Sequence, residues 1–282
     1  MEIRPINLTI EQQRQLLPVQ FHDLVNRDET HVFVALDGDM VQGTALASET
    51  IENGVSVLVI HYLSLVSAKN ETVVMQLLAY LEQLCQKADI RKLVCRVTGQ
   101  EQLLAAYNHI LSNASFCRAF TKGRHMVYHL KAIKETIFFA KIPQLTPIMA
   151  KVKCYNELDM FHLSQFHDQL KATRILPEHY MPDLVFAQYY VDDDEIKGFM
   201  DFKEVDEGVL LLTDSYVEKD VKNQFVAPAM IACAMRTTDS FLTDEAQLIL
   251  ETYDEGMRSG ITACFGQPEV DTAIWEYSKE LG

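Results

Sequence analysis

Apolar residues occur along this chain in short runs and alternating stretches, separated by polar turns and by segments with helical spacing. The clearest helical segment is residues 72–88, where apolar residues recur at steps of three and four. Apolar runs at residues 57–66 and 209–217 predict two long strands. The pattern therefore predicts a fold in which strands and helices are mixed along the whole chain.

Two stretches of the chain resemble each other. Lys69-Asn70 follows the first long strand and opens a helical segment, and Lys222-Asn223 does the same 153 residues later. A second match joins the predicted hairpin turn in residues 37–43 to that in residues 192–198. Two matches with the same surrounding elements indicate an internal duplication.

The same order of elements is predicted in both copies: a strand, two helices, a hairpin, a long strand, a loop with a helix, and a further strand. The first copy then continues with a helix and a closing hairpin that turns at Lys122-Gly123, and the second copy includes a predicted helix at residues 177–185. The last segment, residues 270–281, fits a strand or a helix. We expect a first domain at residues 1–131, a connector at 132–148 and a second domain at 149–282.

Composition and charge narrow the range of partners. The formal net charge is −15 and the pI is about 5.0, which disfavours nucleic acid and anionic membranes as partners. The six cysteines form no C-x-x-C pair, and His162 and His167 are five residues apart, so we expect reduced thiols and no metal site. Without a signal-peptide pattern, we expect a cytoplasmic protein, either a monomer or a homodimer.

The order of elements in both halves resembles that of the GNAT superfamily of acyl-CoA N-acyltransferases. In that family the loop after the long strand carries the pattern R-G-x-G-x-G/A, whose backbone amides hold the pyrophosphate of coenzyme A at a helix N-terminus. Here Lys69 and Lys222 stand at the arginine position. The three glycine positions hold Asn70, Thr72 and Val74 in the first copy and Asn223, Phe225 and Ala227 in the second.

The resemblance implies an α+β fold of two tandem GNAT-like domains, each with a mixed, mostly antiparallel sheet flanked by helices. It also implies acetyl-CoA as co-substrate. The residues implied to contact coenzyme A are Ser64, Leu65, Val66, Lys69, Asn70, Glu71, Thr72 and Val74 in the first domain and Val217, Lys222, Asn223 and Gln224 in the second. Because Phe225 stands at a glycine position, we expect the first domain to bind acetyl-CoA more tightly.

Three polar residues are candidates for catalysis. His61 and Asp214 lie in the apolar runs of the two long strands, at an offset of 153, and either could take a proton from the acceptor amine. Tyr107, in the helix after the next strand, stands where the family often has a tyrosine that protonates the leaving thiolate. At the same offset the second copy has Gly260, so it offers no equivalent tyrosine.

Two functions stay open from the sequence. The first is transfer of an acetyl group to a primary amine, on a cationic small molecule or a peptide lysine, because acidic residues cluster on predicted hairpin segments. The second is a non-catalytic tandem GNAT-like protein that binds a metabolite or a partner protein. The retained lysines and Tyr107 favour the enzyme, and the missing glycines favour the binding protein.

Overall fold

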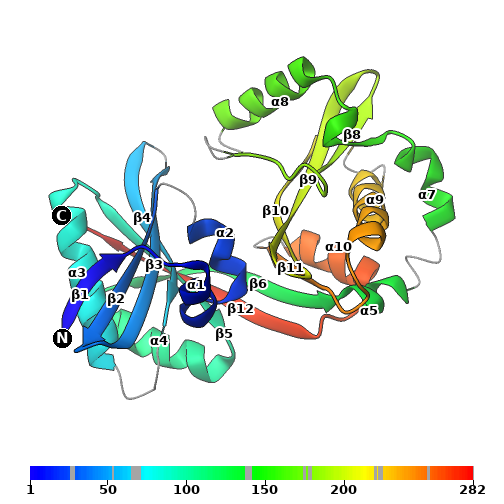
Figure 1. Ribbon diagram of the computed structural model, residues 1–282. Helices are drawn as coiled ribbons and strands as arrows, with labels where there is room; N and C mark the ends of the chain where they lie inside the picture. The colour runs from blue at the N-terminus through cyan, green and yellow to red at the C-terminus, as the bar shows by residue number, and fades with distance from the viewer. Residues whose placement is uncertain are drawn as a thin grey trace. The chain divides into compact units, whose positions relative to one another are not determined.

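The computed structural model of the chain is shown in Figure 1. The chain divides into two compact units, Met1–His125 with Asp271–Gly282, and Met126–Val270. Both are mixed sheets with helices packed against them, which confirms the predicted α+β class. The structure describes residues 1–25, 29–52, 54–64, 71–136, 142–173, 176, 180–218, 221, 225–252 and 255–281.

The first unit has a mixed sheet with strand order β1-β2-β3-β4-β5-β12. Its strands are β1 (Glu2–Ile6), β2 (Thr30–Asp37), β3 (Met40–Glu52), β4 (Val55–Leu63), β5 (Lys92–Gly99) and β12 (Val270–Glu280), and β6 (Cys117–His129) begins in this unit. Its helices are α1 (Ile10–Leu16), the 3-10 turn η1 (Val19–Phe21), α2 (His22–Val25), α3 (Glu71–Lys87) and α4 (Glu101–Asn113). β4 and β5 are parallel, and the other pairs along this order are antiparallel.

Helix α3 packs on the sheet with the apolar stripe that its spacing predicts. Leu77, Leu78 and Leu81 are almost fully buried in the core of the first unit. The close approach of α3 to β3 depends on Gly43, because a Cβ there would lie 2.8 Å from a methyl carbon of Val73. The glycine of the first predicted hairpin therefore allows the helix that follows the long strand to dock.

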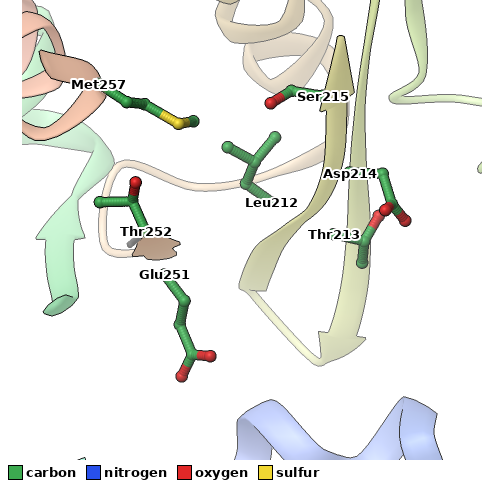
Figure 2. A pocket seen from close by; sticks show the side chains of 7 residues that line it. All are labelled: Leu212, Thr213, Asp214, Ser215, Glu251, Thr252 and Met257. Atoms are coloured by element: carbon green, nitrogen blue, oxygen red, sulfur yellow. The ribbon is translucent and has the colours of Figure 1, made fainter. Parts of the chain in front are cut away.

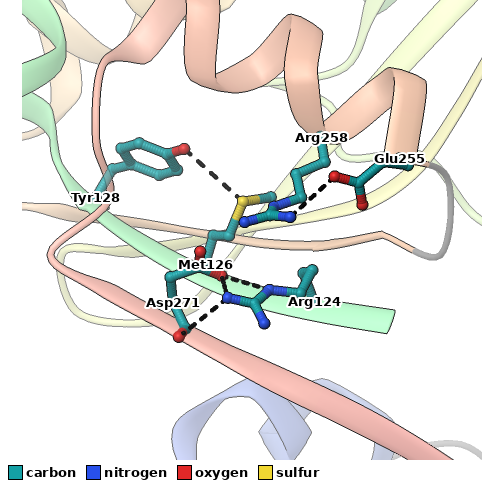
Figure 3. A network of polar contacts seen from close by, with 6 residues as sticks. All are labelled: Arg124, Met126, Tyr128, Glu255, Arg258 and Asp271. Atoms are coloured by element: carbon teal, nitrogen blue, oxygen red, sulfur yellow. Dashed lines mark hydrogen bonds and ion pairs between the residues drawn. The ribbon is translucent and has the colours of Figure 1, made fainter. Parts of the chain in front are cut away.

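The last strand of the first unit comes from the C-terminal end of the chain. β12 pairs antiparallel with β5, from Ala273 opposite Gly99 to Glu280 opposite Lys92, which resolves the ambiguous last segment as a strand. At the start of β12, Asp271 forms an ion pair with Arg124 of β6, with its Oδ1 2.7 Å from Nε (Figure 3). Residues 271–282 therefore belong to the first unit by their contacts, although we expected them in the second domain.

The predicted closing hairpin at Lys122-Gly123 is wrong, because β6 runs through both residues as one strand. Its position beside β5 is taken by β12. The pairing of β12 with β5 is reinforced by Arg96 and Glu276, whose Nε and Oε2 are 3.1 Å apart. Tyr277 of the same strand is fully buried in the first core.

The second unit has a mixed sheet with strand order β11-β10-β9-β8-β7, in which only β10 and β11 are parallel. Its strands are β7 (Val152–Cys154), β8 (Gln188–Asp192), β9 (Glu195–Asp206), β10 (Val209–Val217) and β11 (Gln247–Thr252). Its helices are α5 (Leu130–Lys134), α7 (Ile142–Met149), the 3-10 turn η2 (Tyr155–Glu157), α8 (Met160–Ala172), α9 (Val226–Phe241) and α10 (Glu255–Phe265).

Helices α8 and α9 cover opposite faces of this sheet. Tyr189 and Phe199 pack with side chains of α8, whereas their neighbours Tyr190 and Met200 pack with side chains of α9. Successive residues of a strand point to opposite faces, so Asp201 lies on the α8 side of the sheet. None of the described helices combines the length and apolar character needed to cross a membrane.

The predicted helix at residues 177–185 is wrong over the part that the structure describes, residues 180–185. The Asp183 side chain accepts hydrogen bonds from the backbone amides of Val185 and Phe186, both at 2.8 Å. A carboxylate that bonds to amides just after it stabilises a turn in place of a helix.

Candidate functional site

In both units the long strand separates from its parallel neighbour part way along. The pairing of β4 with β5 ends at Ile60 and Cys95, and that of β10 with β11 ends at Leu211 and Ile249. β4 then continues to Leu63 and β10 to Val217. Ligands of sheets with parallel strands commonly bind beyond the carboxyl ends of such strands, where the connection pattern opens a crevice.

An open cleft of about 390 Å³ lies at the divergence in the second unit. Figure 2 shows its residues: one group comes from β10, a second from the end of β11, and Met257 comes from α10. The lining consists of Leu212, Thr213, Asp214, Ser215, Glu251, Thr252 and Met257. We call this space the β10/β11 cleft.

The lining of the β10/β11 cleft combines charge, hydroxyl groups and apolar surface. Asp214 and Glu251 are lining residues from adjacent strands, and Figure 2 shows the Asp214 side chain on the opposite side of β10 from Leu212 and Ser215. Two carboxylates at a cleft favour a cationic ligand. Leu212 and Met257 supply apolar contacts, and three hydroxyl side chains supply donors and acceptors. Its volume falls in the range of small-ligand sites. Glu251 was not identified from the sequence; its only signal is a carboxylate near the end of the strand next to β10.

A β-bulge interrupts the long strand of the first unit. β3 pairs Leu46 with Tyr62 and Ala47 with Ile60, which leaves His61 as the extra residue. The half-buried His61 ring lies with its Nε2 2.7 Å from the hydroxyl oxygen of Ser48. The predicted base of the first domain is therefore held by a side chain of the neighbouring strand.

The second unit has a bulge at the matching place, with Thr213 as the extra residue. β9 pairs Phe202 with Leu212 and Asp201 with Asp214. The counterpart of the first unit's bulged histidine is therefore Thr213, and placing Asp214 at that position was wrong by one residue. The offset between the copies is 152 on the long strands (Ile60 and Leu212), because the intervening loops differ in length.

Tyr107 and Ser64 are engaged at the end of β4. The buried Tyr107 hydroxyl donates a hydrogen bond to the backbone carbonyl of Leu63. Ser64 donates its amide to the Thr44 carbonyl and accepts the Thr44 amide on its hydroxyl, both at 2.8 Å. The Tyr107 hydroxyl and the amide and hydroxyl of Ser64 are thus bonded within the protein.

The other predicted contact residues are divided between described and undescribed parts of the chain. Glu71 begins α3, with Oε1 3.4 Å from the side-chain amide of Asn113. Thr72 is exposed, Val74 is fully buried in the core, and Val217 pairs with Gly198 at the end of β10. The positions outside the described residues are Leu65, Val66, Lys69, Asn70, Lys222, Asn223 and Gln224.

Phe225 stands at the residue before α9 and has a left-handed backbone conformation, with φ of 59°. Glycine adopts this region without steric cost, whereas other L-residues are strained there. Its side chain is 65% exposed. The backbone at this motif position thus keeps a conformation suited to the family's glycine although the side chain is large.

A buried carboxylate that the sequence reasoning missed lies next to the cleft. Asp201 of β9 is fully buried, and its Oδ1 accepts a hydrogen bond of 3.0 Å from the backbone amide of Asp183. Its Oδ2 accepts a bond of 3.3 Å from the Thr213 hydroxyl. Burial raises the pKa of Asp201 to about 6, against the lowering effect of the Asp183 amide. Its sequence signal was one aspartate inside the apolar run 199–202.

Aromatic residues surround this carboxylate on the α8 side of the sheet. Burial, and then the charge of Asp201, raise the pKa values of the Tyr180 and Tyr189 hydroxyls. His167 of α8 lies with its Nε2 3.2 Å from the Tyr189 hydroxyl, and burial lowers its pKa to about 4. At neutral pH the imidazole is therefore uncharged, and Asp201 is the group in this cluster that titrates near neutrality.

Comparison with known proteins identifies the fold. No protein-family model and no curated protein matches the sequence. A tandem GNAT protein from the clavulanic acid biosynthesis pathway superposes with a TM-score of 0.65 at 13% identity, over 100% of this chain and 98% of that one. A GCN5-related N-acetyltransferase from Sphaerobacter thermophilus gives 0.55 at 11% identity, over 93% of this chain and 84% of that one.

A third similar structure is the glucosamine N-acetyltransferase region of a fungal multi-domain β-N-acetylglucosaminidase. Its TM-score is 0.68 at 8% identity, and the match covers 99% of this chain but only 38% of that one. At such identities the likeness concerns the fold. The chain has the fold of tandem GNAT proteins, as its order of elements predicts.

Proposed function

We propose that this protein is an acyl-CoA-dependent N-acyltransferase that acetylates a primary amine, and that transfer takes place in the β10/β11 cleft. The observation that carries the proposal is the open cleft of about 390 Å³ between two diverging parallel strands, with Asp214 and Glu251 among its lining residues. Proteins with similar folds include N-acetyltransferases, one of them described as acting on glucosamine.

The cleft residues fit the pantetheine arm of acetyl-CoA. Leu212 and Met257 would contact its alkyl portions, and the hydroxyls of Ser215 and Thr252 would bond its amides. When bound, acetyl-CoA supplies the acetyl group as a thioester. The second domain therefore becomes the favoured site, in place of the first domain that the motif comparison favoured.

The two carboxylates have separate roles in the proposal. An amine acceptor is a cation in water and must lose a proton before it attacks a carbonyl carbon. Glu251 would attract and orient the ammonium group, and Asp214 would accept its proton. Both belong to adjacent strands of one sheet, so their spacing is fixed by the fold rather than by loops.

The first unit is a second candidate for the site of the same reaction. There His61 would act as base and Tyr107 as acid, the roles that the family resemblance implies. The Tyr107 hydroxyl already donates to the Leu63 carbonyl at the end of β4, so it would have to exchange that bond to protonate a thiolate. We therefore rank this site below the β10/β11 cleft.

The experiment is release of free thiol from acetyl-CoA across a panel of polyamines, aminoglycosides, amino acids and lysine peptides. We expect turnover of cationic acceptors, a fall in kcat of about a hundredfold in Asp214→Asn, and a higher acceptor KM in Glu251→Gln. Asp206→Asn, at the end of β9, is the matched control and should behave as wild type.

Three results would change the proposal. Loss of activity in His61→Ala and Tyr107→Phe, with Asp214→Asn unaffected, would move the reaction to the first unit. A preference for anionic acceptors would contradict the role of the carboxylates. If no acceptor gives thiol release and acetyl-CoA does not bind, a non-catalytic binding protein is favoured. The lost glycines and the bulky Phe225 support that function.

A further inference from the structure

Asp201 connects two parts of the second unit through its two carboxylate oxygens. Oδ1 accepts the backbone amide of Asp183 at 3.0 Å, and Oδ2 accepts the Thr213 hydroxyl at 3.3 Å. The same hydroxyl lies 3.2 Å from the Asp201 backbone carbonyl. Because Asp201 is fully buried, water does not compete for these bonds.

The two hydrogen-bond partners of Asp201 lie in irregular backbone: Thr213 at the bulge of β10 and Asp183 in the non-helical segment 180–187. Thr213 is the bulged residue of β10 and lines the cleft beside Asp214. A bulge re-aims the side chains next to it, so the position of Thr213 affects the direction of Asp214. Asp183 organises the non-helical residues 180–187 by accepting the amides of Val185 and Phe186.

The charged and titratable groups around Asp201 come from every element packed on it. The Tyr180 hydroxyl and Lys203 of the same strand favour its charged form, and the charge of Asp183 in the covering segment opposes it. Asp214 lies opposite on β10. Tyr180 and Tyr189 are kept protonated by burial and by the charge of Asp201 itself. Asp201 is thus a buried charge with only partial compensation.

We propose that Asp201 is a positioning residue of the β10/β11 cleft: its buried carboxyl group connects the Thr213 bulge to the 180–187 segment and thereby holds Asp214 in its direction. The catalytic consequence rests on the proposed function, but the structural coupling does not. An ionised carboxylate accepts both bonds. A protonated one can keep both connections, because its O–H can donate to the Thr213 hydroxyl oxygen while that hydroxyl donates to the Asp201 backbone carbonyl 3.2 Å away. Because burial favours the uncharged form, the connection is stronger when Asp201 holds its proton.

The retention of an ionisable group here supports a role beyond packing. A buried charge destabilises the fold unless it is well paired, and asparagine would fill the same space without that cost. Residues that lower stability are characteristic of positions where function requires them. The pKa of about 6 means that the coupling would respond to pH near neutrality.

The direct test is amide hydrogen exchange of residues 180–187, compared between wild type and Asp201→Asn from about pH 5 to pH 8. Taking the ratio of the two proteins at each pH removes the intrinsic pH dependence of exchange. In wild type, we expect protection to rise about tenfold as pH drops through the pKa of Asp201, because the raised pKa means that the closed segment binds the proton more tightly than the open one. In Asp201→Asn, protection should not change with pH.

A second pair of variants tests the Thr213 connection without removing the buried charge. Thr213→Val should abolish the pH response of the bulge amides, and Thr213→Ser, which keeps the hydroxyl, should restore it. Where acyl transfer is measurable, Asp201→Asn and Thr213→Val should lower kcat with little change in acetyl-CoA KM, and Asp206→Asn should follow wild type.

Some results would overturn the inference. The inference is wrong if amide exchange has the same pH dependence in wild type and Asp201→Asn. It is also wrong if Thr213→Ser does not restore the pH response of the bulge amides that Thr213→Val removes. Exchange needs no turnover, so an inactive wild-type protein with the expected exchange pattern would refute the proposed function and leave the coupling standing. If Asp201→Asn does not fold, the Thr213 pair decides.

Discussion

Replacing Asp201 by asparagine should stabilise the protein at neutral pH. The carboxyl has a pKa of about 6 in the folded chain, against 3.8 for an ordinary aspartate. A difference of about 2 pH units is worth about 3 kcal/mol at 1.36 kcal/mol per unit. Because the side chain is fully buried, this value needs no reduction for solvent screening.

The sign follows from which state binds the proton more tightly. The folded-state pKa of Asp201 is raised, so its contribution to stability is fully present below the unfolded-state pKa and is lost as pH rises through about 6. At pH 8 the wild type has lost the whole of about 3 kcal/mol, and at pH 4.5 only about 1 kcal/mol. Asp201→Asn has no such dependence.

The substitution also weakens hydrogen bonding. An asparagine amide has one acceptor oxygen for the Asp183 amide and the Thr213 hydroxyl, and the poorer bonding should cost about 1 kcal/mol. The variant should therefore be about 2 kcal/mol more stable than wild type at pH 8 and about equal to it at pH 4.5.

Urea denaturation at both pH values measures this difference, with an unchanged m value showing that the same surface is exposed on unfolding. Asp206→Asn serves as the control, because it removes a carboxylate from the end of the same strand. If Asp201→Asn is destabilised by the same amount at pH 4.5 and pH 8, burial does not raise the pKa of Asp201, and its charge does not destabilise the fold.

Three further substitutions test the fold. Phe225→Gly should stabilise the protein by about 0.5–1 kcal/mol in thermal denaturation, because it removes the strain of a left-handed backbone conformation at an exposed position. The control Phe161→Gly, in helix α8, should destabilise the protein. A loss of stability in Phe225→Gly would show that Phe225 is not strained. Gly43→Ala should lower the free energy of unfolding by about 1–3 kcal/mol, because its Cβ would lie 2.8 Å from a methyl carbon of α3. Gly260→Ala, whose Cβ would meet open space, should not lower it. Equal effects of the two substitutions would mean that α3 shifts freely. Tyr107→Phe should cost about 1–3 kcal/mol in denaturant, because it leaves the buried carbonyl at the end of β4 without its partner, and an unchanged midpoint would show that the bond contributes nothing.

Local sequence signals predicted the elements that depend on local physics. The spacing of apolar residues in α3 placed Leu77, Leu78 and Leu81 correctly in the core. The acidic turn at residues 192–194 closes the hairpin of β8 and β9, with Asp193 and Asp194 both at positive φ. These features need only a few neighbouring residues to be stable, so a single sequence contains enough information to find them.

Partners distant in sequence could not be predicted in the same way. The hairpin at Lys122-Gly123 was a sound local prediction, but β6 continues and β12 pairs with β5 from far along the chain. Strand partners are chosen by burial and register across the whole fold, which a local pattern does not reveal. Likewise, the Asp183 side chain bonds to amides that a helix would have used, so residues 180–187 form a turn.

The candidate site shows the same limit. The apolar run 209–217 located β10 and with it Asp214, which does line the cleft. Its register relative to the first copy was wrong by one residue, because a bulge cannot be read from hydrophobicity alone. Glu251 and Asp201 are separated from Asp214 in sequence, Asp201 meets it by strand pairing, and Glu251 comes to the same cleft from the neighbouring strand, so no motif marks them.

Calorimetric titration of acetyl-CoA into wild type and Met257→Trp tests whether the thioester arm binds in the β10/β11 cleft. Met257 lines the β10/β11 cleft, and a larger ring there would fill the space in which the thioester arm is proposed to lie. Leu103→Trp, at an exposed position of α4 in the first unit, controls for an added indole. We expect wild type and Leu103→Trp to bind acetyl-CoA and Met257→Trp to have lost that binding. Equal affinity of all three proteins, or no binding by wild type, would contradict the proposed site.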